Sequence, residues 1–217
     1  MADSETMPEL LDENDVVGLL IRQHAMIRDL FAEVEQATGG ARAEAFERLV
    51  RLLAIHETAE EEIVHPYARR TLDGGDAIVD ERLREENESK QLLSMMEERG
   101  TDDQSFVSHL EKLRVAVMEH ARAEERYEFA QLVRETSDIE RRTMALGVKA
   151  AEAMAPTHPH PGVESATMNI VVGTPTAIMD RARDVIRQTM AKAKAPAGKQ
   201  QEKKNPKGGG KGKGTKP

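Results

Sequence analysis

The stretch FVSHLEKLRVAVMEHARAEERY, residues 106–127, decides the fold, because its core-type positions recur every three or four residues. The residues on this stripe are Phe106, Leu110, Leu113, Val117, His120, Glu124 and Tyr127. His120 and Glu124 occupy positions that a packed core would normally fill with apolar side chains. Burying an ionisable group is costly unless the group is paired or binds a metal. The stretch therefore predicts an amphipathic helix that carries polar groups into a core.

Two stretches upstream show the same period. The first predicted helix begins at Asn14 or Asp15, runs to about Ala37 and is closed by Gly39-Gly40. Its stripe is Val17, Leu20, Ile21, His24, Ile27, Phe31 and Val34. The second runs over about 43–70 and should bend near Pro66. Its stripe is Phe46, Leu49, Leu53, His56, Glu60 and Ile63.

A third helix is predicted over about 77–98, between Asp73-Gly74-Gly75 and Gly100, and the segment Thr101-Asp102-Asp103 offers caps for the fourth. The inward line assigned to the third helix is Ile78, Glu81, Glu85, Glu88, Leu92 and Met95. Short connections between long amphipathic helices imply antiparallel neighbours. The predicted fold is all-α, an up-down-up-down four-helix bundle with an extra C-terminal helix.

Composition divides the chain into four parts. Residues 1–13 are predicted to be a disordered leader, 14–136 the bundle, 137–194 a helical extension with a Pro-rich linker, and 195–217 a disordered Lys/Gly-rich tail. The extension should contain a helix to about Met154 and an amphipathic helix over 175–194. The apolar face of the latter could pack on the bundle, on a protein partner or on a second copy.

Charge and residue usage exclude several classes of protein. The segment from Ala191 carries nine Lys and one Glu, a charge of +8. Because the whole chain has a net charge of −8, residues 1–190 carry −16. An acidic body of this kind does not suit specific nucleic-acid binding. The N-terminus lacks a basic segment followed by an apolar one, so neither a secretory signal nor a membrane span is expected, and the cytoplasm is the expected location. The absence of Cys restricts any metal site to nitrogen and oxygen ligands.

The polar residues in the four stripes predict a metal site. Side chains four residues apart lie on one face of a helix, so His56 with Glu60 and His120 with Glu124 can each reach a common ion. The candidate ligands are His24, His56, Glu60, Glu85, Glu88, His120 and Glu124. Seven such donors suit two octahedral ions with a position left for water or dioxygen. Imidazole and carboxylate ligands favour iron, with manganese or zinc as competitors.

Each part of this pattern also has an ordinary structural interpretation. A single His in an apolar stripe is usually a hydrogen-bonded core residue. A His and a Glu four residues apart commonly form a solvated ion pair. Glu85 and Glu88 lie in a charge-rich run that is typical of an exposed face. A metal-free helical interaction module therefore remains an alternative. His65 is expected to be exposed or outside the direct ligands.

The segment from His56 to Pro66, HETAEEEIVHP, together with His24 and the later HARAEE segment from His120, resembles the hemerythrin-like HHE cation-binding domain. The resemblance covers about residues 12–135. The Pro-His-Pro linker and the segment from Asp180 to Arg183 are similar to the C-terminal extension of bacterial members. The resemblance implies a four-helix bundle that holds a non-haem di-iron centre.

The resemblance also suggests roles for the ligands. Glu60 and Glu124 would bridge two iron ions, the three histidines would be terminal ligands, and Glu85 and Glu88 would complete the set. Oxygen-carrying hemerythrins have a His-x-x-x-His pair on the third helix, whereas residues 85–90 here contain no His. A centre richer in carboxylates favours the ferric state. Glu57, Glu61, Glu81 and Glu125 are alternative carboxylate ligands.

The function expected from the resemblance is oxygen or iron sensing, redox protection or iron handling, with dioxygen, another diatomic molecule or peroxide as the small ligand. The alternative is a di-iron enzyme that turns over peroxide, nitric oxide or dioxygen.

Overall fold

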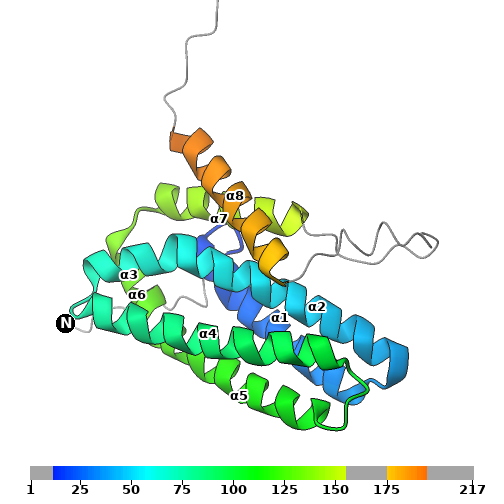
Figure 1. The fold of residues 1–217 in the computed structure, drawn as a ribbon. Coiled ribbons are helices and arrows are strands. Elements are labelled where there is room, and N and C mark those ends of the chain that lie inside the picture. Colours follow the sequence, from blue (N-terminus) through cyan, green and yellow to red (C-terminus); the bar gives the residue numbers. More distant parts are fainter. Residues whose placement is uncertain (1–11, 155–174, 195–217) are drawn as a thin grey trace, which may run out of the picture.

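The computed structural model describes residues 12–154 and 175–194, and every regular element in these two ranges is a helix. Four arms form the bundle (Figure 1). The first arm is α1 (Val16–Gln36). The second contains α2 (Gly39–Ala59), the π-helix η2 (Glu60–Val64) and α3 (His65–Thr71). The third is α4 (Gly75–Arg99). The fourth contains α5 (Phe106–Ala123), the π-helix η3 (Glu124–Phe129) and α6 (Ala130–Glu135).

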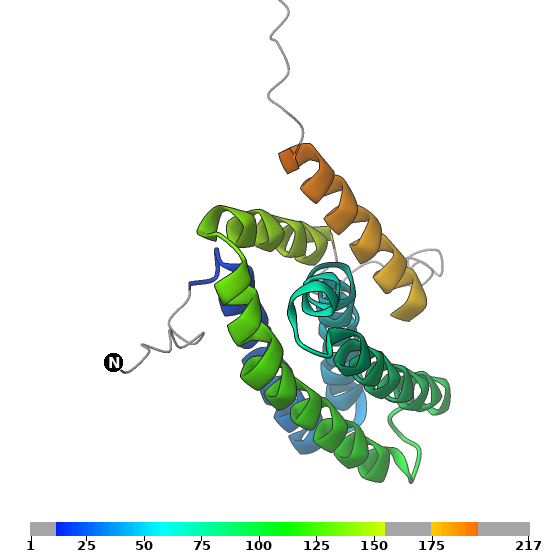
Figure 2. The ribbon, with the colours of Figure 1, turned by 90° about the vertical axis from the view of Figure 1, so that its left-hand side faces the viewer.

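Contacts between successive arms, and between the first and the fourth, close the bundle. The predicted all-α bundle with an added C-terminal helix is thus confirmed. The extension consists of α7 (Asp138–Met154) and α8 (Pro175–Lys194), which pack on each other and on α2 (Figures 1 and 2). The predicted leader (residues 1–11 of it), Pro-rich linker and basic tail lie outside the described residues.

Local signals explain where the arms begin and end. The Asp15 side chain caps α1 by accepting a hydrogen bond from the Val17 amide, at 3.0 Å. Gly74 has a φ of 72°, and a Cβ on Gly75 would lie 2.2 Å from the Ala68 carbonyl oxygen, so the turn into α4 requires both glycines. One boundary differs from the prediction: Gly39 begins α2 instead of closing α1.

The two π-helices were not predicted, and they change which side chains face inward. A π-helix forms i→i+5 hydrogen bonds and therefore takes an extra residue into a turn. In η2 the His65 amide donates to the Glu60 carbonyl, and Pro66, which has no amide hydrogen, follows directly. In η3 the wider turn leaves Tyr127, an expected stripe residue, 54% exposed and buries Glu128 instead.

The third arm is rotated relative to the prediction. The observed inward line of α4 passes through Val79, Glu86, Ser89, Leu93 and Met96. This line is one residue out of step with the predicted line through Glu85 and Glu88. One residue of an α-helix corresponds to a rotation of about 100°. The predicted inward line is wrong because α4 has few apolar residues. Two lines one residue apart therefore fit its sequence almost equally well.

The bundle has two apolar clusters, one toward each end. The far-end cluster lies near the α1–α2 and α4–α5 connections and contains Ile27, Phe31, Val34, Ala45, Phe46, Leu49, Val50, Leu53, Leu93, Met96, Phe106, Leu110, Leu113 and Val117. The near-end cluster joins the start of α1 to η2, η3, α6, α7 and α8. Along α1 and α2, His24 and His56 fall between residues of the two clusters. The bundle therefore carries a polar layer between two apolar ones.

Candidate metal centre

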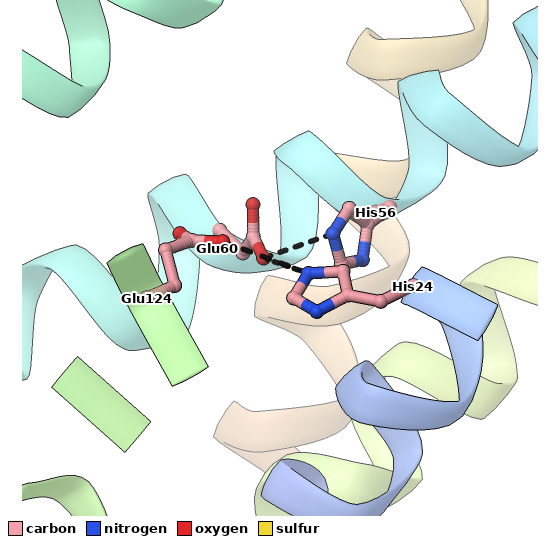
Figure 3. Close-up of side chains that lie close together, drawn as sticks. All are labelled: His24, His56, Glu60 and Glu124. Atoms are coloured by element: carbon pink, nitrogen blue, oxygen red, sulfur yellow. Dashed lines mark ion pairs between the residues drawn. The ribbon is translucent and has the colours of Figure 1, made fainter. Parts of the chain in front are cut away.

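Eight buried or nearly buried side chains form the polar layer. They are His24, His56, Glu60, His65, Glu86, His120, Glu124 and Glu128. Seven of them are at most 6% exposed, and the side chain of His120 is 11% exposed. All four arms contribute to the layer, which explains why no single stretch of sequence contains it. Figure 3 shows His24, His56, Glu60 and Glu124 converging from three arms.

Two of the three groups within the layer that have the donors of a metal site share Glu60. In the first group, one ligand atom each from His24, His56, Glu60 and Glu124 lies within 4.8 Å of the others. The second group meets the same distance limit and consists of Glu60, Glu86 and His120. Glu60 belongs to both groups, so its carboxylate can bridge two ions. His120 Nε2 also lies 3.4 Å from Glu124 Oε1, which brings the fourth arm's carboxylate to both groups.

Each histidine of these groups has one ring nitrogen fixed by a neighbour and the other turned inward. His56 Nδ1 lies 2.8 Å from the Gln23 side-chain oxygen, and His24 Nδ1 lies 2.7 Å from Glu125 Oε1. His120 Nδ1 is 3.1 Å from Glu85 Oε2. This arrangement, in which a hydrogen bond on one nitrogen sets the ring orientation, is characteristic of metal-binding histidines.

The inward atoms lack hydrogen bonds among the described residues. They include His24 Nε2, His120 Nε2 and both carboxylate oxygens of Glu60 and of Glu124. The nearest approach is His56 Nε2 to Glu60 Oε1, at 3.0 Å, while His24 Nε2 is 3.6 Å from Glu60 Oε1. Buried polar atoms are rarely left in this state. A cation among these oxygen and nitrogen atoms would satisfy them together.

The layer holds more negative than fixed positive charge. Glu57, at 7% exposure, is a further buried carboxylate beside the layer. Lys90 Nζ lies 2.6 Å from Glu61 Oε1 and 3.5 Å from the nearest carboxylate oxygens of Glu57 and Glu86. Leaving buried charges unmatched costs several kcal/mol. Additional positive charge, from protons or from metal ions, is therefore needed here.

The pKa values indicate how the layer is balanced when protons supply that charge. Burial alone would lower the pKa of His120, but Glu124 and Glu60 outweigh burial and raise it to about 12. Burial also lowers the pKa of His24, but hydrogen bonding to Glu124, Glu125 and Glu60 outweighs burial and raises this pKa well above 6.5. Burial raises the pKa of Glu57 to about 8. Divalent cations can replace such protons, because a metal ligand must be deprotonated.

The space at the centre is small. A cavity of about 20 Å³ is lined by residues that include His24, His56, Glu60, Glu86 and His120. One water molecule requires at least about 10–15 Å³. The centre therefore has room for a water molecule or a diatomic molecule beside its side chains, and none for a large substrate.

The extension supports the layer from outside. Glu152 of α7 accepts a hydrogen bond from the Gln23 side-chain amide at 2.6 Å, and Gln23 in turn orients His56. In α8, Arg183 contacts Glu61 and Glu62 at 3.1 Å each. Arg187 forms a two-point contact with Glu62 at 2.7 and 2.8 Å. Ala182 and Ile186 are 3% and 0% exposed within the chain, so this part of the apolar face of α8 packs on the bundle and α7, the first of the three expected alternatives.

The structure brings together five of the seven predicted ligands: His24, His56, Glu60, His120 and Glu124. It does not place Glu85 or Glu88 among them. Glu85 approaches His120 Nδ1 and is paired with Arg82, so it holds the far side of the ring. The Glu88 side chain is 65% exposed and pairs with Arg84 at 2.8 Å. The rotation of α4 accounts for both placements, since it turns Glu86 inward.

Three members of the layer were missed in the sequence. The sequence signal for Glu86 is its spacing of seven residues from both Val79 and Leu93, which places all three on one face of α4. His65, expected outside the ligands, is 3% exposed, with Nε2 2.7 Å from Glu86 Oε1. Glu128 follows Glu124 by four residues. An α-helical period does not reveal His65, because five residues separate it from Glu60 and only the π-helix turns it inward.

Comparison with known proteins gives two matches. The family model described as the hemerythrin HHE cation-binding domain matches residues 15–132, more than half of the chain. A curated protein named DNA nickase, from Nostoc sp. (strain PCC 7120 / SAG 25.82 / UTEX 2576), is 29% identical over 140 residues. The aligned region is 64% of this chain but only 39% of the Nostoc protein. No solved structure matches the chain.

Proposed function

Because this chain belongs to the hemerythrin HHE cation-binding family, we propose that the polar layer binds two iron ions and serves in oxygen or iron sensing, redox protection or iron handling. The first ion would be held by His24, His56, Glu60 and Glu124. The second would be held by His120, Glu60 and Glu86. The observation that carries the proposal is that the inward atoms of the layer lack hydrogen bonds. The outer nitrogen of each imidazole ring is held by a neighbour, so that the other nitrogen faces the centre.

The donors suit iron better than softer or harder metals. Imidazole and carboxylate are the ligands that non-haem iron shares with manganese and zinc, and thiolates are absent from the chain. Both groups have two carboxylates, and the second has one imidazole where the first has two, so carboxylates are the larger share of its donors and favour the ferric state there. When bound, the ions would supply one-electron chemistry toward a small ligand. The residues themselves position the ions and exclude larger molecules.

The small cavity also limits the ligand. A volume of about 20 Å³, which bound ions would share, leaves no room for an organic substrate and favours a ligand as small as dioxygen, nitric oxide or peroxide. This favours a sensor or a protective centre, and it leaves a peroxide-consuming or nitric-oxide-consuming enzyme as the second candidate. DNA nicking is in the name of the Nostoc relative, of which the aligned region is 39%, and a DNA backbone does not fit a cavity of about 20 Å³. None of the helices described is both long and apolar enough to cross a membrane. A cytoplasmic location, expected from the sequence, is part of what we propose.

Metal analysis of protein purified without chelator tests the proposal. We expect two irons per chain and an oxo-to-iron charge-transfer band in the optical spectrum. His56→Ala and His120→Ala should each remove at least one iron. His109→Ala is the matched control, because His109 lies on the same helix as His120 but outside the polar layer. Full iron occupancy in His56→Ala or His120→Ala would show that the assignment for that arm is wrong, and protein without metal would refute the function.

Oxygen evolution after addition of peroxide separates the two candidate roles. A sensor or storage centre reacts at most once per centre, whereas an enzyme continues to release oxygen. Sustained turnover that His120→Ala abolishes would favour the enzyme.

A further inference from the structure

The polar layer contains a third group of metal-type donors that the two proposed iron positions do not use. His65, Glu124 and Glu128 each offer a ligand atom, and these atoms lie within 4.8 Å of one another. Their exposed fractions are 3%, 0% and 2%. The group is as deeply buried as the first two. It lies one turn farther along the second and fourth arms, where η2 and η3 displace the helical register.

The orientation of His65 is that of a metal ligand. Its Nε2 lies 2.7 Å from Glu86 Oε1, which fixes the ring. Its Nδ1 lies 3.8 Å from Glu128 Oε2 and has no hydrogen-bond partner among the described residues. His24, His56 and His120 have the same division between a fixed and an inward nitrogen, with the two ring positions exchanged. A carboxylate that orients an imidazole toward a cation is a common arrangement in metal sites.

The carboxylates of the group also lack sufficient partners. Both oxygens of Glu128 and both of Glu124 have no hydrogen bond within the described part of the chain. Arg82 Nε lies 3.2 Å from Glu128 Oε1, but the geometry is not that of a hydrogen bond, and the Arg82 side chain pairs with Glu85 instead. Arg82 therefore offsets part of the charge of Glu128 and leaves Glu128 Oε2 without a hydrogen bond, while the histidines nearest to Glu124 lie 3.4 and 3.6 Å from its oxygens. A simple His65–Glu86 ion pair would not explain these free oxygens.

We propose that His65, Glu124 and Glu128 form a third cation site, selective for a divalent transition-metal ion, next to the two-ion centre. The site goes beyond the proposed di-iron function and shares only Glu124 with it. One imidazole and two carboxylates suit Fe²⁺, Mn²⁺, Co²⁺ or Zn²⁺. His65 also lines an open groove of about 570 Å³ with Glu61, Glu62 and residues of α3, α4 and α8. One ligand residue of the third site thus lies at a groove on the surface of the bundle.

Counting ions in the full chain tests the site. Metal-free protein carrying His158→Ala and His160→Ala, which removes both imidazoles of the Pro-His-Pro segment, is saturated with Co²⁺ without oxygen, desalted and measured by native mass spectrometry. We expect three Co²⁺ per chain, and two after Glu128→Gln or His65→Gln. Glu88→Gln is the matched control, because it removes an exposed carboxylate of the same bundle, and it should retain three.

Glu128→Gln preserves the size of the side chain, and far-UV circular dichroism checks that each variant is folded. Anomalous diffraction at the cobalt edge provides evidence without any variant, with a third peak expected between His65 and Glu128. The proposal is overturned if the parent protein binds only two ions, or if Glu128→Gln retains three. A fall from two ions to one in Glu128→Gln would also overturn it, since His65 and Glu128 would then belong to the two-ion centre.

The same count separates this proposal from the di-iron function. His120→Ala should remove the second ion and leave the ion at His65. If His120→Ala removes nothing while Glu128→Gln removes one ion, the third site is supported and the assignment of the two-ion centre fails.

Discussion

The far-end cluster and the polar layer are built on the same arms, yet they are stabilised in different ways. The far-end cluster packs Phe31, Leu49, Phe106 and Leu110 at 5% exposure or less. Its burial of apolar surface contributes about 25 cal/mol per Å² without help from any other molecule. The polar layer is equally buried but contains four carboxylates and four imidazoles. Its stability therefore depends on what supplies the balancing positive charge.

The difference shows that position in a helical stripe does not determine chemical role. In the far-end cluster a stripe residue contributes by its volume, and in the polar layer it contributes by its charge and by the direction of its donor atoms. The two regions should consequently respond differently to chelation, to substitution and to pH.

Removing the bound ions is expected to have the largest effect. An ion present at a thousandfold excess over its Kd adds about 4 kcal/mol to the free energy of unfolding, so the loss of two ions lowers it by about 8 kcal/mol. Hydrogen-exchange mass spectrometry with and without chelator should show lost protection at residues 56–65 and 120–129, with a smaller change at 27–34 and 106–113. Unchanged protection, or earlier loss in the far-end cluster, would contradict the comparison.

Substitution of Glu86 should have the next largest effect. Glu86→Gln keeps the size of the side chain but removes a charged donor of the second ion, so the affinity for that ion should fall by at least the 10–100-fold that loss of an outer partner costs. Glu88→Gln, two residues along the same helix, should leave the affinity unchanged because its side chain is exposed. Competition with a chelator of known affinity measures both. Equal losses of metal affinity in the two variants would contradict the inward position of Glu86 and support the line through Glu85 and Glu88 predicted from the sequence.

A change of one pH unit should have the smallest of these three effects, and it should act on the metal affinity. Burial would lower the pKa of His65, but Glu128 and Glu86 raise it to about 10, and the pKa of His120 is raised to about 12. Without metal both imidazoles hold a proton at pH 7, and metal binding must release it. Metal affinity should therefore rise with pH, by about tenfold per unit for each proton released. Titration calorimetry in buffers with different ionisation enthalpies counts the protons.

The stability of the metal-free protein should change in the opposite direction. A histidine whose pKa is raised on folding stabilises the protein fully below its unfolded pKa of about 6.5, and this contribution is lost as the pH rises through the folded value. For His65 the window is from about 6.5 to about 10. Urea unfolding at pH 6, 8 and 10 measures the decline, and a metal-free protein that is equally stable at pH 6 and 10 would refute it.

Much of the fold could be predicted from the sequence because long amphipathic periods are strong signals. The runs from Val17 to Val34 and from Phe106 to Val117 identify arms that can bury only one face, and short connections make neighbouring arms antiparallel. The His24, His56 and His120 positions were equally readable, since each interrupts an apolar stripe at a core position. The pairs with Glu60 and Glu124 then follow from the spacing of four residues.

The sequence by itself thus determined the bundle, its four amphipathic arms and the five donors that lie in clear stripes. The tertiary structure alone decided the rest. It chose Glu86 over Glu85 and Glu88, because the acidic α4 has too few apolar residues to define its phase. It brought in His65, because five residues separate it from Glu60 and only the extra residue of the π-helix η2 turns it into the layer. It also chose Glu128 over Tyr127, because both follow Glu124 at a helical spacing and η3 decides which of them is buried.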